Sequence, residues 1–268
     1  MIKTSEQIDS TSNNQILGTL VADLYAVESL NDRFDRYANT IESLGFDAVC
    51  YSFIPATSLI SPDKLAPIFK HSSNFPLSFL TQYEADNFYC NDFTIREVQE
   101  NNLSPKDWKK SEESGKLSKE ECNVIKIARE QHGIKNALSL ATMNDASGIS
   151  GVSIISFKED AEFKSLKKKY LHLIENCSQF FNDLIMLQSR SHVIQTFVSP
   201  QIPPITPKEK VVLKGLVTGT PIKKIGEEEN MSHSSVSNHL QRLRKKFHVQ
   251  KTTELQQLLQ SLNILGDL

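Results

Sequence analysis

The side chains best suited to recognition chemistry lie along a helix that the sequence predicts at roughly His233 to His248. At about 100° per residue, this helix has an apolar face made of Val236, Leu240, Leu243 and Phe247. Its outward side carries Ser234, Asn238, Gln241 and Lys245, flanked by Ser235 and Arg242. Asn and Gln can pair with adenine, Arg with guanine, and Ser and Lys with phosphate. Segment 232–250 has no acidic residue, so we predict that this side binds DNA rather than forming an ordinary solvated face.

Charge is distributed unevenly along the 268 residues. Residues 205–268 contain ten Lys/Arg and six Asp/Glu, a net charge of +4. The remaining residues contain 20 basic and 26 acidic side chains, a net charge of −6. A small basic module joined to a larger acidic one predicts that only the module meets a polyanion such as double-stranded DNA.

Several kinds of catalytic chemistry are missing from the sequence. It shows no glycine-rich phosphate loop, no nucleophile elbow and no metal-spaced His/Cys set. The four cysteines, which form no CxxC pair, are Cys50, Cys90, Cys122 and Cys177. We interpret them as buried free thiols. The expectation is a protein that is not an enzyme and has no catalytic residue, metal or cofactor.

The N-terminal segment 1–15 is polar and lacks the charged-then-apolar pattern of a signal peptide. No apolar run approaches the roughly 20 residues that span a membrane. We therefore expect a cytoplasmic protein with no membrane partner.

Residues 205–268 predict four short helices with recognisable caps. Thr206, Pro207 and Glu209 form a capping-box pattern at the first helix, which Gly219 ends. Thr220 is expected to cap the second helix and Ser232 the third. Thr252 or Thr253 is expected to cap the fourth helix, which carries Leu255, Leu258, Leu259 and Leu262.

Three prolines, Pro200, Pro203 and Pro204, mark a boundary because regular structure cannot continue through them. We predict a first domain at 1–190, a linker at 191–204 and a DNA-binding domain at 205–268. The first domain alternates helices, at 20–44, 77–88, 119–132 and 161–188, with strands, at 48–54, 66–71, 136–142 and 151–157. This pattern predicts an α/β sandwich, an antiparallel sheet flanked by helices, followed by an all-α four-helix helix-turn-helix domain.

The C-terminal run closely resembles the LuxR-type helix-turn-helix. The matching positions are Thr206, Glu209, Leu213, Gly219, Ile225, Ser232, Val236, His239, Lys246 and Phe247. Gly226 stands where such modules usually have alanine, and we expect it to loosen the second helix slightly. His239 lies at the edge of the packed face and is interpreted as a structural histidine with a satisfied ring.

Upstream, the chain more weakly resembles the domain with which quorum-sensing LuxR-type receptors bind acyl-homoserine lactones. The resemblance implies that residues 1–190 are a ligand-binding and dimerisation domain. Phe79, Tyr83, Asp92 and the pair Pro105/Trp108 follow in order. By the resemblance, Asp92 would accept a hydrogen bond from a ligand amide, Tyr83 would bond an acyl carbonyl, and Trp108 would wall the pocket. Ser139 falls where the family often has a polar pocket residue. The alternative interpretation is that the aromatic residues are ordinary core and Asp92 is a turn or cap residue.

Three positions depart from that receptor pattern. Phe79 replaces the tryptophan that contacts the lactone, Phe75 stands where relatives often have tyrosine, and Phe93 replaces a proline. A lactone carbonyl left unpaired at Phe79 would cost roughly 1–3 kcal/mol. We therefore hypothesise a small amphipathic signal molecule that is not a standard acyl-homoserine lactone, or is one bound weakly.

Together these features predict a ligand-responsive, homodimeric transcriptional regulator of quorum-sensing type. One alternative is a ligand-independent dimeric transcription factor whose N-terminal domain only dimerises. A response regulator shares the C-terminal module, but residues 1–50 lack the acidic cluster that its phosphoacceptor site needs. An enzyme is disfavoured by the missing motifs above.

Overall fold

The structure is a computed structural model that describes residues 5–55, 67–145, 148–188, 204–247 and 249–262. The chain divides into two compact units. The larger is made of Met1–Ile54, Ala66–Asn144 and Ile149–Ile185, and the smaller is mainly Met186–Leu268. The predicted linker at 191–204 lies almost entirely outside the described residues.

The larger unit is built on a five-stranded sheet with the strand order β2-β1-β5-β4-β3. The strands are β1 (Ala48–Pro55), β2 (Ile68–His71), β3 (Lys106–Asp107), β4 (Asn136–Asp145) and β5 (Gly148–Ser156). β1 pairs antiparallel with β2, with Cys50 opposite His71. β3 pairs antiparallel with β4, with Lys106 opposite Ser139. The antiparallel sheet is as predicted, but the two-residue edge strand β3 is too short to leave a periodic signal in the sequence.

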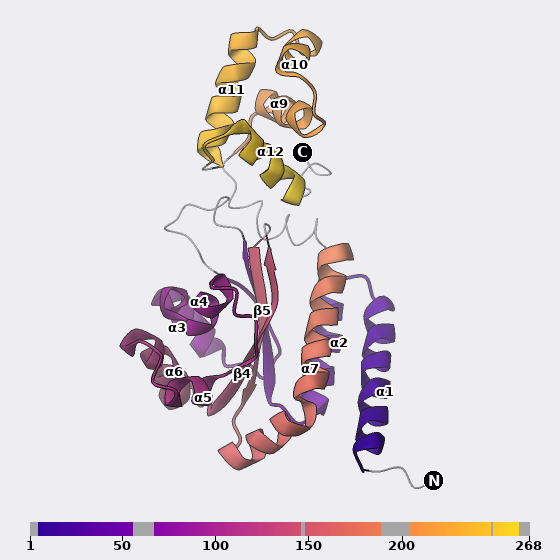
Figure 1. Cartoon of the computed structure of the whole chain (residues 1–268), viewed down its shortest axis with the longest axis vertical. Helices are drawn as coiled ribbons and strands as arrows, with labels where there is room; N and C mark the ends of the chain where they lie inside the picture. Colours follow the sequence, from indigo (N-terminus) through magenta and orange to yellow (C-terminus); the bar gives the residue numbers. More distant parts are fainter. Residues whose placement is uncertain (1–4, 56–66, 146–147, 189–203, 248, 263–268) are drawn as a thin grey trace. The chain divides into compact units, whose positions relative to one another are not determined.

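Helices cover both faces of this sheet (Figure 1). One face carries α1 (Ser5–Tyr25), α2 (Leu30–Ser43) and α7 (Asp160–Gln188). The other carries α3 (Leu77–Ala85), α4 (Phe93–Gln99), α5 (Trp108–Glu113) and α6 (Lys119–His132). A 3-10 turn, η2 (Phe88–Asn91), precedes α4. The predicted α/β sandwich is confirmed.

The prediction of one helix at 20–44 is wrong, because the segment forms the end of α1 and the whole of α2. Ser29 caps α2 by accepting a hydrogen bond from the Asp32 amide at 3.0 Å. The buried Arg33 donates from Nε to the carbonyls of Leu24 and Val27, at 3.3 and 3.1 Å. These bonds satisfy carbonyls that a continuous helix would satisfy internally, so the break is stable.

The helix predicted at 77–88 ends earlier, at Ala85, because Asn87 adopts a left-handed conformation with φ 52°. Two further short helices, α4 and α5, then start on aspartate caps, Asp92 and Asp107. In contrast, α6 has the predicted bounds. Its capping box joins Ser118 to Glu121, and Gly133 ends it at φ 72°.

An aromatic and polar core joins α2 and α7 to the sheet. The rings of Tyr37 and Phe181 stack with their centroids 4.7 Å apart. Beside them, the amide oxygen of buried Asn182 accepts hydrogen bonds from Tyr51 at 3.0 Å and from Ser150 at 2.7 Å. These three buried polar side chains therefore satisfy one another.

The smaller unit contains α9 (Pro207–Val217), α10 (Ile222–Glu228), α11 (His233–Lys246) and α12 (Thr252–Leu262). Its core includes Val212, Leu213, Leu216, Ile225, Val236, Leu240, Leu243, Phe247, Leu255 and Leu259. The Thr206–Glu209 capping box and the Ser232 cap are present as predicted. Leu258 and Leu262 belong to α12, but the structure does not describe their side chains, and His248, at the predicted end of α11, lies outside the described residues.

Two local predictions in this unit are wrong, and the loosening expected at Gly226 stays a prediction. Pro221, not Thr220, occupies the N-cap of α10 and makes no side-chain cap bond. α12 already includes Thr252 and Thr253, and the carboxylate of Glu254 accepts from the amide before the helix, that of Lys251, at 3.1 Å. Gly226 has a steric role, because a Cβ there would lie 2.7 Å from the carbonyl oxygen of Met231.

Within the described residues, no helix has the length and apolar character needed to cross a lipid bilayer.

Candidate ligand pocket and DNA-binding face

An aromatic cavity of about 50 Å³ lies between the sheet and helices α3 to α5. Five of the six predicted ligand-binding residues line it, namely Phe75, Phe79, Tyr83, Asp92 and Trp108. All the aromatic members are buried. The rings of Phe79 and Tyr83 meet edge to face at 5.8 Å, which is a favourable geometry for aromatic pairs. The fold therefore brings these five predicted side chains together around one cavity.

The polar centre of this cavity is the pair Tyr83 and Asp92. The Tyr83 hydroxyl donates to Asp92 Oδ2 at 2.7 Å. Asp92 Oδ1 accepts from the backbone amide and the hydroxyl of Thr94, at 2.8 and 2.7 Å. Burial, and next the charge of Asp92, raise the pKa of Tyr83 well above 10, so the phenol stays protonated. Asp92 thus caps α4 while its other oxygen faces Tyr83.

The sixth predicted residue, Ser139, lies on β4 beside Trp108. The indole Nε1 of Trp108 donates to Ser139 Oγ at 2.9 Å. Ser139 Oγ also lies 3.1 Å from Ser153 Oγ on β5. The hydrogen bonds fix the orientation of the tryptophan ring against the sheet, because a buried N–H without a partner is costly.

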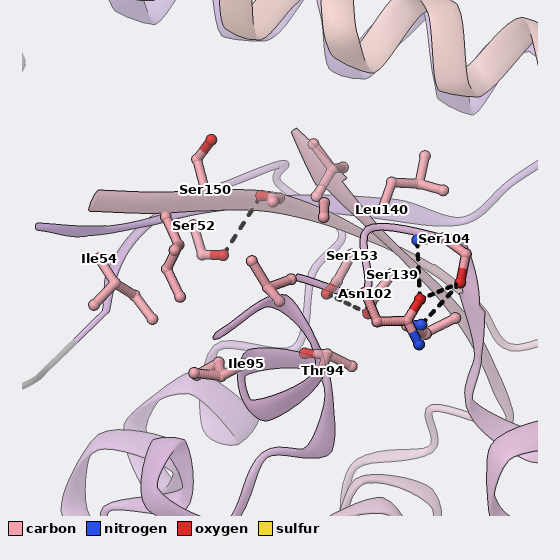
Figure 2. Close-up of a pocket in the computed structure, with 16 residues that line it drawn as sticks. Ser52, Ile54, Thr94, Ile95, Asn102, Ser104, Ser139, Leu140, Ser150 and Ser153 are labelled. Carbon is pink, nitrogen blue, oxygen red and sulfur yellow. Dashed lines mark hydrogen bonds between the residues drawn. The ribbon is translucent and has the colours of Figure 1, made fainter. Parts of the chain in front are cut away.

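A second cavity, also of about 50 Å³, adjoins the first beneath α4 (Figure 2). Ser52, Thr94, Ile95 and Ser153 line both cavities, and Ser139 lines the second. Figure 2 shows Ser52 on the side of the sheet that faces α4, whereas the Ser150 hydroxyl points the other way. Sequence reasoning missed Ser52, Thr94 and Ser153. Only the period-two alternation of small polar residues on β1 and β5 could have indicated the two serines.

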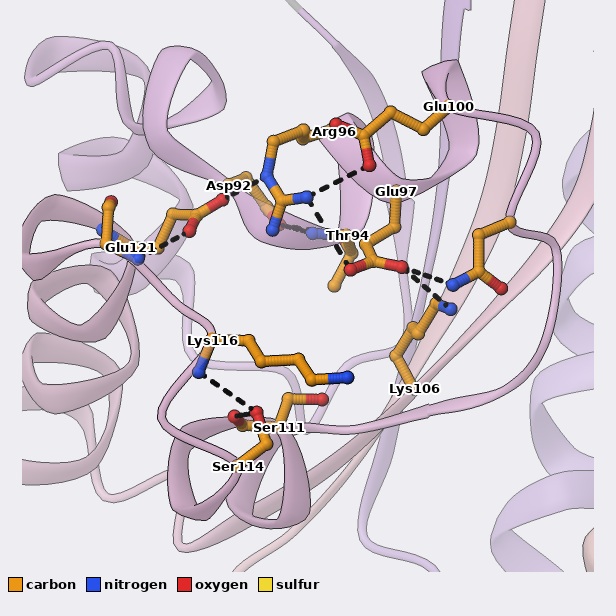
Figure 3. Close-up of polar contacts among 12 residues, drawn as sticks. Asp92, Thr94, Arg96, Glu97, Glu100, Lys106, Ser111, Ser114, Lys116 and Glu121 are labelled. Atoms are coloured by element: carbon orange, nitrogen blue, oxygen red, sulfur yellow. Dashed lines mark hydrogen bonds and ion pairs between the residues drawn. The ribbon is translucent and has the colours of Figure 1, made fainter.

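A network of charged side chains holds α4 in place next to these cavities (Figure 3). Arg96 Nε donates to Glu121 Oε1 on α6 at 2.7 Å, and its Nη1 donates to Glu100 at 3.1 Å. Burial alone would raise the pKa of Glu121, but Arg96 and the Ser118 amide together lower it. Lys106 on β3 forms an ion pair with Glu97 at 3.1 Å. These contacts position the roof of the second cavity and offer no catalytic arrangement.

The outward side of α11 matches the predicted DNA-binding surface. Ser234, Asn238, Gln241, Arg242 and Lys245 are exposed, and Ser235 is half-buried. The opposite side packs through Val236, Leu240 and Leu243. The helix therefore presents amides, hydroxyls and bases to solvent on a rigid support.

A buried ion pair fixes α11 on α9. Lys246 Nζ lies 2.7 Å from Glu209 Oε2 and also donates to the Pro204 carbonyl at 2.7 Å. Burial alone would raise the pKa of Glu209, but Lys246 and the Thr206 amide lower it. The pair ties the capping box of one helix to the last turn of the other.

Two sequence interpretations need correction. His239 Nδ1 is buried and has no hydrogen-bond partner among the described residues, so its ring is not satisfied as expected. The thiols are free, but only Cys50 and Cys177 are buried, while Cys90 is exposed and Cys122 half-buried. Burial raises the pKa of the Cys177 thiol to about 12. In the part of the chain that the structure describes, no cluster of His, Cys, Asp or Glu side chains could hold a metal.

Comparison with known protein families gives a match for each of the two units. Residues 29–183 match the autoinducer binding domain, and residues 203–259 match bacterial regulatory proteins of the luxR family. The chain belongs to the LuxR family of autoinducer-binding regulators. No curated protein sequence matches it.

Among solved structures, this LuxR-family chain is similar in fold to Escherichia coli SdiA. The two share 15% identity, with 93% of this chain and 97% of SdiA covered and a TM-score of 0.55. SdiA in complex with octanoyl-rac-glycerol gives 14% identity, coverage of 98% and 97%, and a TM-score of 0.53. At these identities the likeness establishes the fold and leaves the contents of the pocket to the chain's own residues.

Proposed function

We propose that this LuxR-family regulator binds double-stranded DNA as a homodimer and that a small amphipathic ligand controls the binding. The observation that carries the proposal is the exposed, acid-free side of α11 with Asn238, Gln241, Arg242 and Lys245. A helix of this kind enters the major groove and reads base edges with its amides and guanidinium group. Ser234 and Ser235, nearest the helix start, are proposed phosphate contacts.

Two copies of the domain are needed because one helix-turn-helix offers a small footprint. Dimers of such domains engage two half-sites one turn of DNA apart, roughly 34–36 Å. We propose that the exposed side of α7 contributes to the dimer surface. Along this helix the apolar side chains of Leu166, Tyr170 and Phe180 are only half-buried in the single chain.

The proposed ligand site is the aromatic cavity of the attached domain. Phe75, Phe79 and Trp108 would enclose an apolar group, while Asp92 and Tyr83 would bond a polar one. Ser139 lines the adjoining second cavity and would contact a ligand that extends into it. A ligand that binds only the folded domain stabilises it and can shift the balance towards the dimer. SdiA in complex with octanoyl-rac-glycerol offers a comparison, because this acylated ligand lacks a lactone ring.

One observation favours a second candidate, a dimeric regulator that needs no ligand. Tyr83 bonds Asp92, and Trp108 bonds Ser139, so these groups are paired without any bound molecule. Under this alternative, the cavity would be part of the core. If small molecules extracted from the producing cells raised the melting temperature of the chain, this result would argue against the ligand-independent alternative.

The test of DNA recognition uses duplexes selected from a random library by the wild-type chain. Asn238→Ala and Arg242→Ala should each weaken binding to the selected duplex, by about 1–3 kcal/mol for a lost base contact. Gel shifts measure the affinity, and circular dichroism should show unchanged folding because both side chains are exposed. Lys214→Ala, which removes an exposed base from α9, is the matched control. Wild-type affinity in both α11 variants would contradict the proposed face.

A further inference from the structure

The two cavities are too small to admit a ligand unless part of the protein moves. Each has a volume of about 50 Å³, less than the roughly 150 Å³ of a cavity that accepts benzene. Both lie against the sheet, and both are lined by Thr94 and Ile95 of α4. Separating the strands would break backbone hydrogen bonds, so a ligand enters more easily by displacing one of the helices that cover the sheet.

Among these helices, α4 has little apolar anchorage. Only its first residue, Phe93, is buried, and this ring belongs to the same hydrophobic core as Tyr83 and Trp108. Ile95 and Val98 are half-buried and line the second cavity. α3 and α6 pack against each other, whereas α4 makes only sparse contacts with each neighbouring element. Segments with few buried apolar contacts open at a small cost in free energy.

Polar contacts with three neighbouring elements hold α4 in place instead (Figure 3). Arg96 forms an ion pair with Glu121 on α6, and Glu97 forms one with Lys106 on β3. On β4, Asn144 Nδ2 donates to a backbone carbonyl in the last turn of α4 at 2.8 Å. These contacts must break if the C-terminal end of α4 moves away from the sheet.

Arg96 is the central residue of this set. Its guanidinium group lies 2.7 Å from Glu121, 3.1 Å from Glu100 and 3.6 Å from Glu97. The Arg96 side chain is 38% exposed, whereas that of Glu121 is 9% exposed and is fixed in the capping box of α6. Exposed ion pairs contribute little net stability and are screened by salt. This contact can therefore hold α4 closed and still open readily.

We propose, as an extension of the proposed function, that α4 is a lid over the ligand site and that Arg96 latches it to Glu121. The lid turns about its N-terminal end, where Phe93 is buried and Asp92 caps the helix. Its C-terminal end swings outward and opens the cavities to small molecules. Arg96 lines neither cavity, so it is a positioning residue that governs entry.

Trp108 reports on the lid without any signal molecule. It is the only tryptophan in the sequence, it is buried, and it lines the aromatic cavity together with Thr94 and Ile95. Acrylamide, a small neutral quencher of fluorescence, reaches the buried indole ring more often when the cavity is open. The quenching constant of the full-length chain therefore measures how often the lid opens.

Arg96→Gln should raise the quenching constant about fivefold, because α4 loses its ion pairs with α6. Arg96→Lys keeps the positive charge and should stay closer to wild type. The matched control is Lys158→Gln, which removes a partly exposed ion pair with Asp47, 3.0 Å long, that does not involve α4. This control should have the wild-type constant.

Salt provides a test that needs only the wild-type chain and therefore holds even if a variant fails to fold. In about 1 M KCl the screening length falls to about 3 Å. The quenching constant of the wild type should then rise, and that of Arg96→Gln should rise much less, because its latch is already missing.

Hydrogen exchange separates opening of the lid from general destabilisation. Backbone amides of α4 should exchange about fivefold faster in Arg96→Gln, while those of α3 and α6 stay close to their wild-type rates. Equal quenching in Arg96→Gln and Lys158→Gln, a wild-type constant that ignores salt, or equal acceleration in all three helices would each overturn the inference. None of these readouts uses DNA or a signal molecule, so failure of the lid is distinguishable from failure of the proposed function.

Discussion

At the scale of single residues, the cavity combines hydrophobic packing with a few aimed polar groups. Tyr83 and Trp108 are both buried, yet each keeps a hydrogen bond through its polar atom. Asp92 serves two purposes, because one oxygen caps α4 and the other faces Tyr83. The two interpretations left open by the sequence, core or pocket, therefore describe the same side chains.

Ser139→Ala should reduce the free energy of unfolding by about 1–3 kcal/mol, because the buried Trp108 N–H loses its acceptor. Urea denaturation followed by the fluorescence of this single tryptophan measures the change. Ser73→Ala, at an exposed position, should stay within about 0.5 kcal/mol of wild type. An equally small effect of Ser139→Ala would show that the indole finds another acceptor.

At the scale of elements, contacts between side chains and helix ends fix the geometry of the DNA-binding unit. The Glu209 carboxylate closes the capping box of α9 and also holds Lys246 in the last turn of α11. Glu209 is 2% exposed and Lys246 is half-buried, so this pair is partly shielded from solvent. The orientation of the outward face of α11 therefore depends on one buried carboxylate.

Glu209→Gln should destabilise the chain by about 1–3 kcal/mol at neutral pH, because a half-buried ammonium group loses its counter-ion. The pKa of Glu209 is lowered in the folded state, so its contribution is present above the unfolded value of 4.5 and is lost as the pH falls below it. The difference between wild type and variant should accordingly shrink in acid.

Denaturant midpoints measured from about pH 2 to pH 7, which covers the lowered pKa of the folded state, would test this dependence. Glu229→Gln, at an exposed position in the turn before α11, is the control and should show no such trend. A difference that stays constant with pH would mean that the lost stability is not electrostatic.

At the scale of the whole molecule, the two proposed activities fall on parts of the chain with opposite net charge. Residues 1–204 have a net charge of −6, which disfavours contact with DNA, while residues 205–268 have a net charge of +4, which favours contact with phosphates. The proposed function thus assigns ligand sensing and DNA recognition to different parts of one chain.

Lys245→Ala should weaken binding to all duplexes similarly and make its salt dependence less steep. If Lys245 contacts one phosphate per subunit, the slope of log affinity against log salt should fall in magnitude by about two for a dimer. Fluorescence anisotropy measures the slope between 50 and 200 mM KCl. Over this range the affinity of a protein that contacts several phosphates falls by roughly 10³ or more. A change of about one would instead indicate one bound subunit, and Lys214→Ala should leave the slope unchanged.

The sequence by itself determined the features that depend on neighbours a few residues away. The capping box at Ser118, the outward side of α11 and the aromatic series from Phe75 to Trp108 could all be predicted, because helix caps and helical periodicity are local. The family resemblance then indicated what these features do.

Only the tertiary structure decided what depends on residues distant in the sequence. The break before α2 rests on where the Arg33 side chain finds carbonyl partners, and the short helices α4 and α5 carry too few residues to show a period. Ser52, Ser139 and Ser153 line one cavity only because β1, β5 and β4 are neighbours in the sheet. The chemistry of the cavity is set by this strand order, because pairing brings together side chains that are about a hundred residues apart.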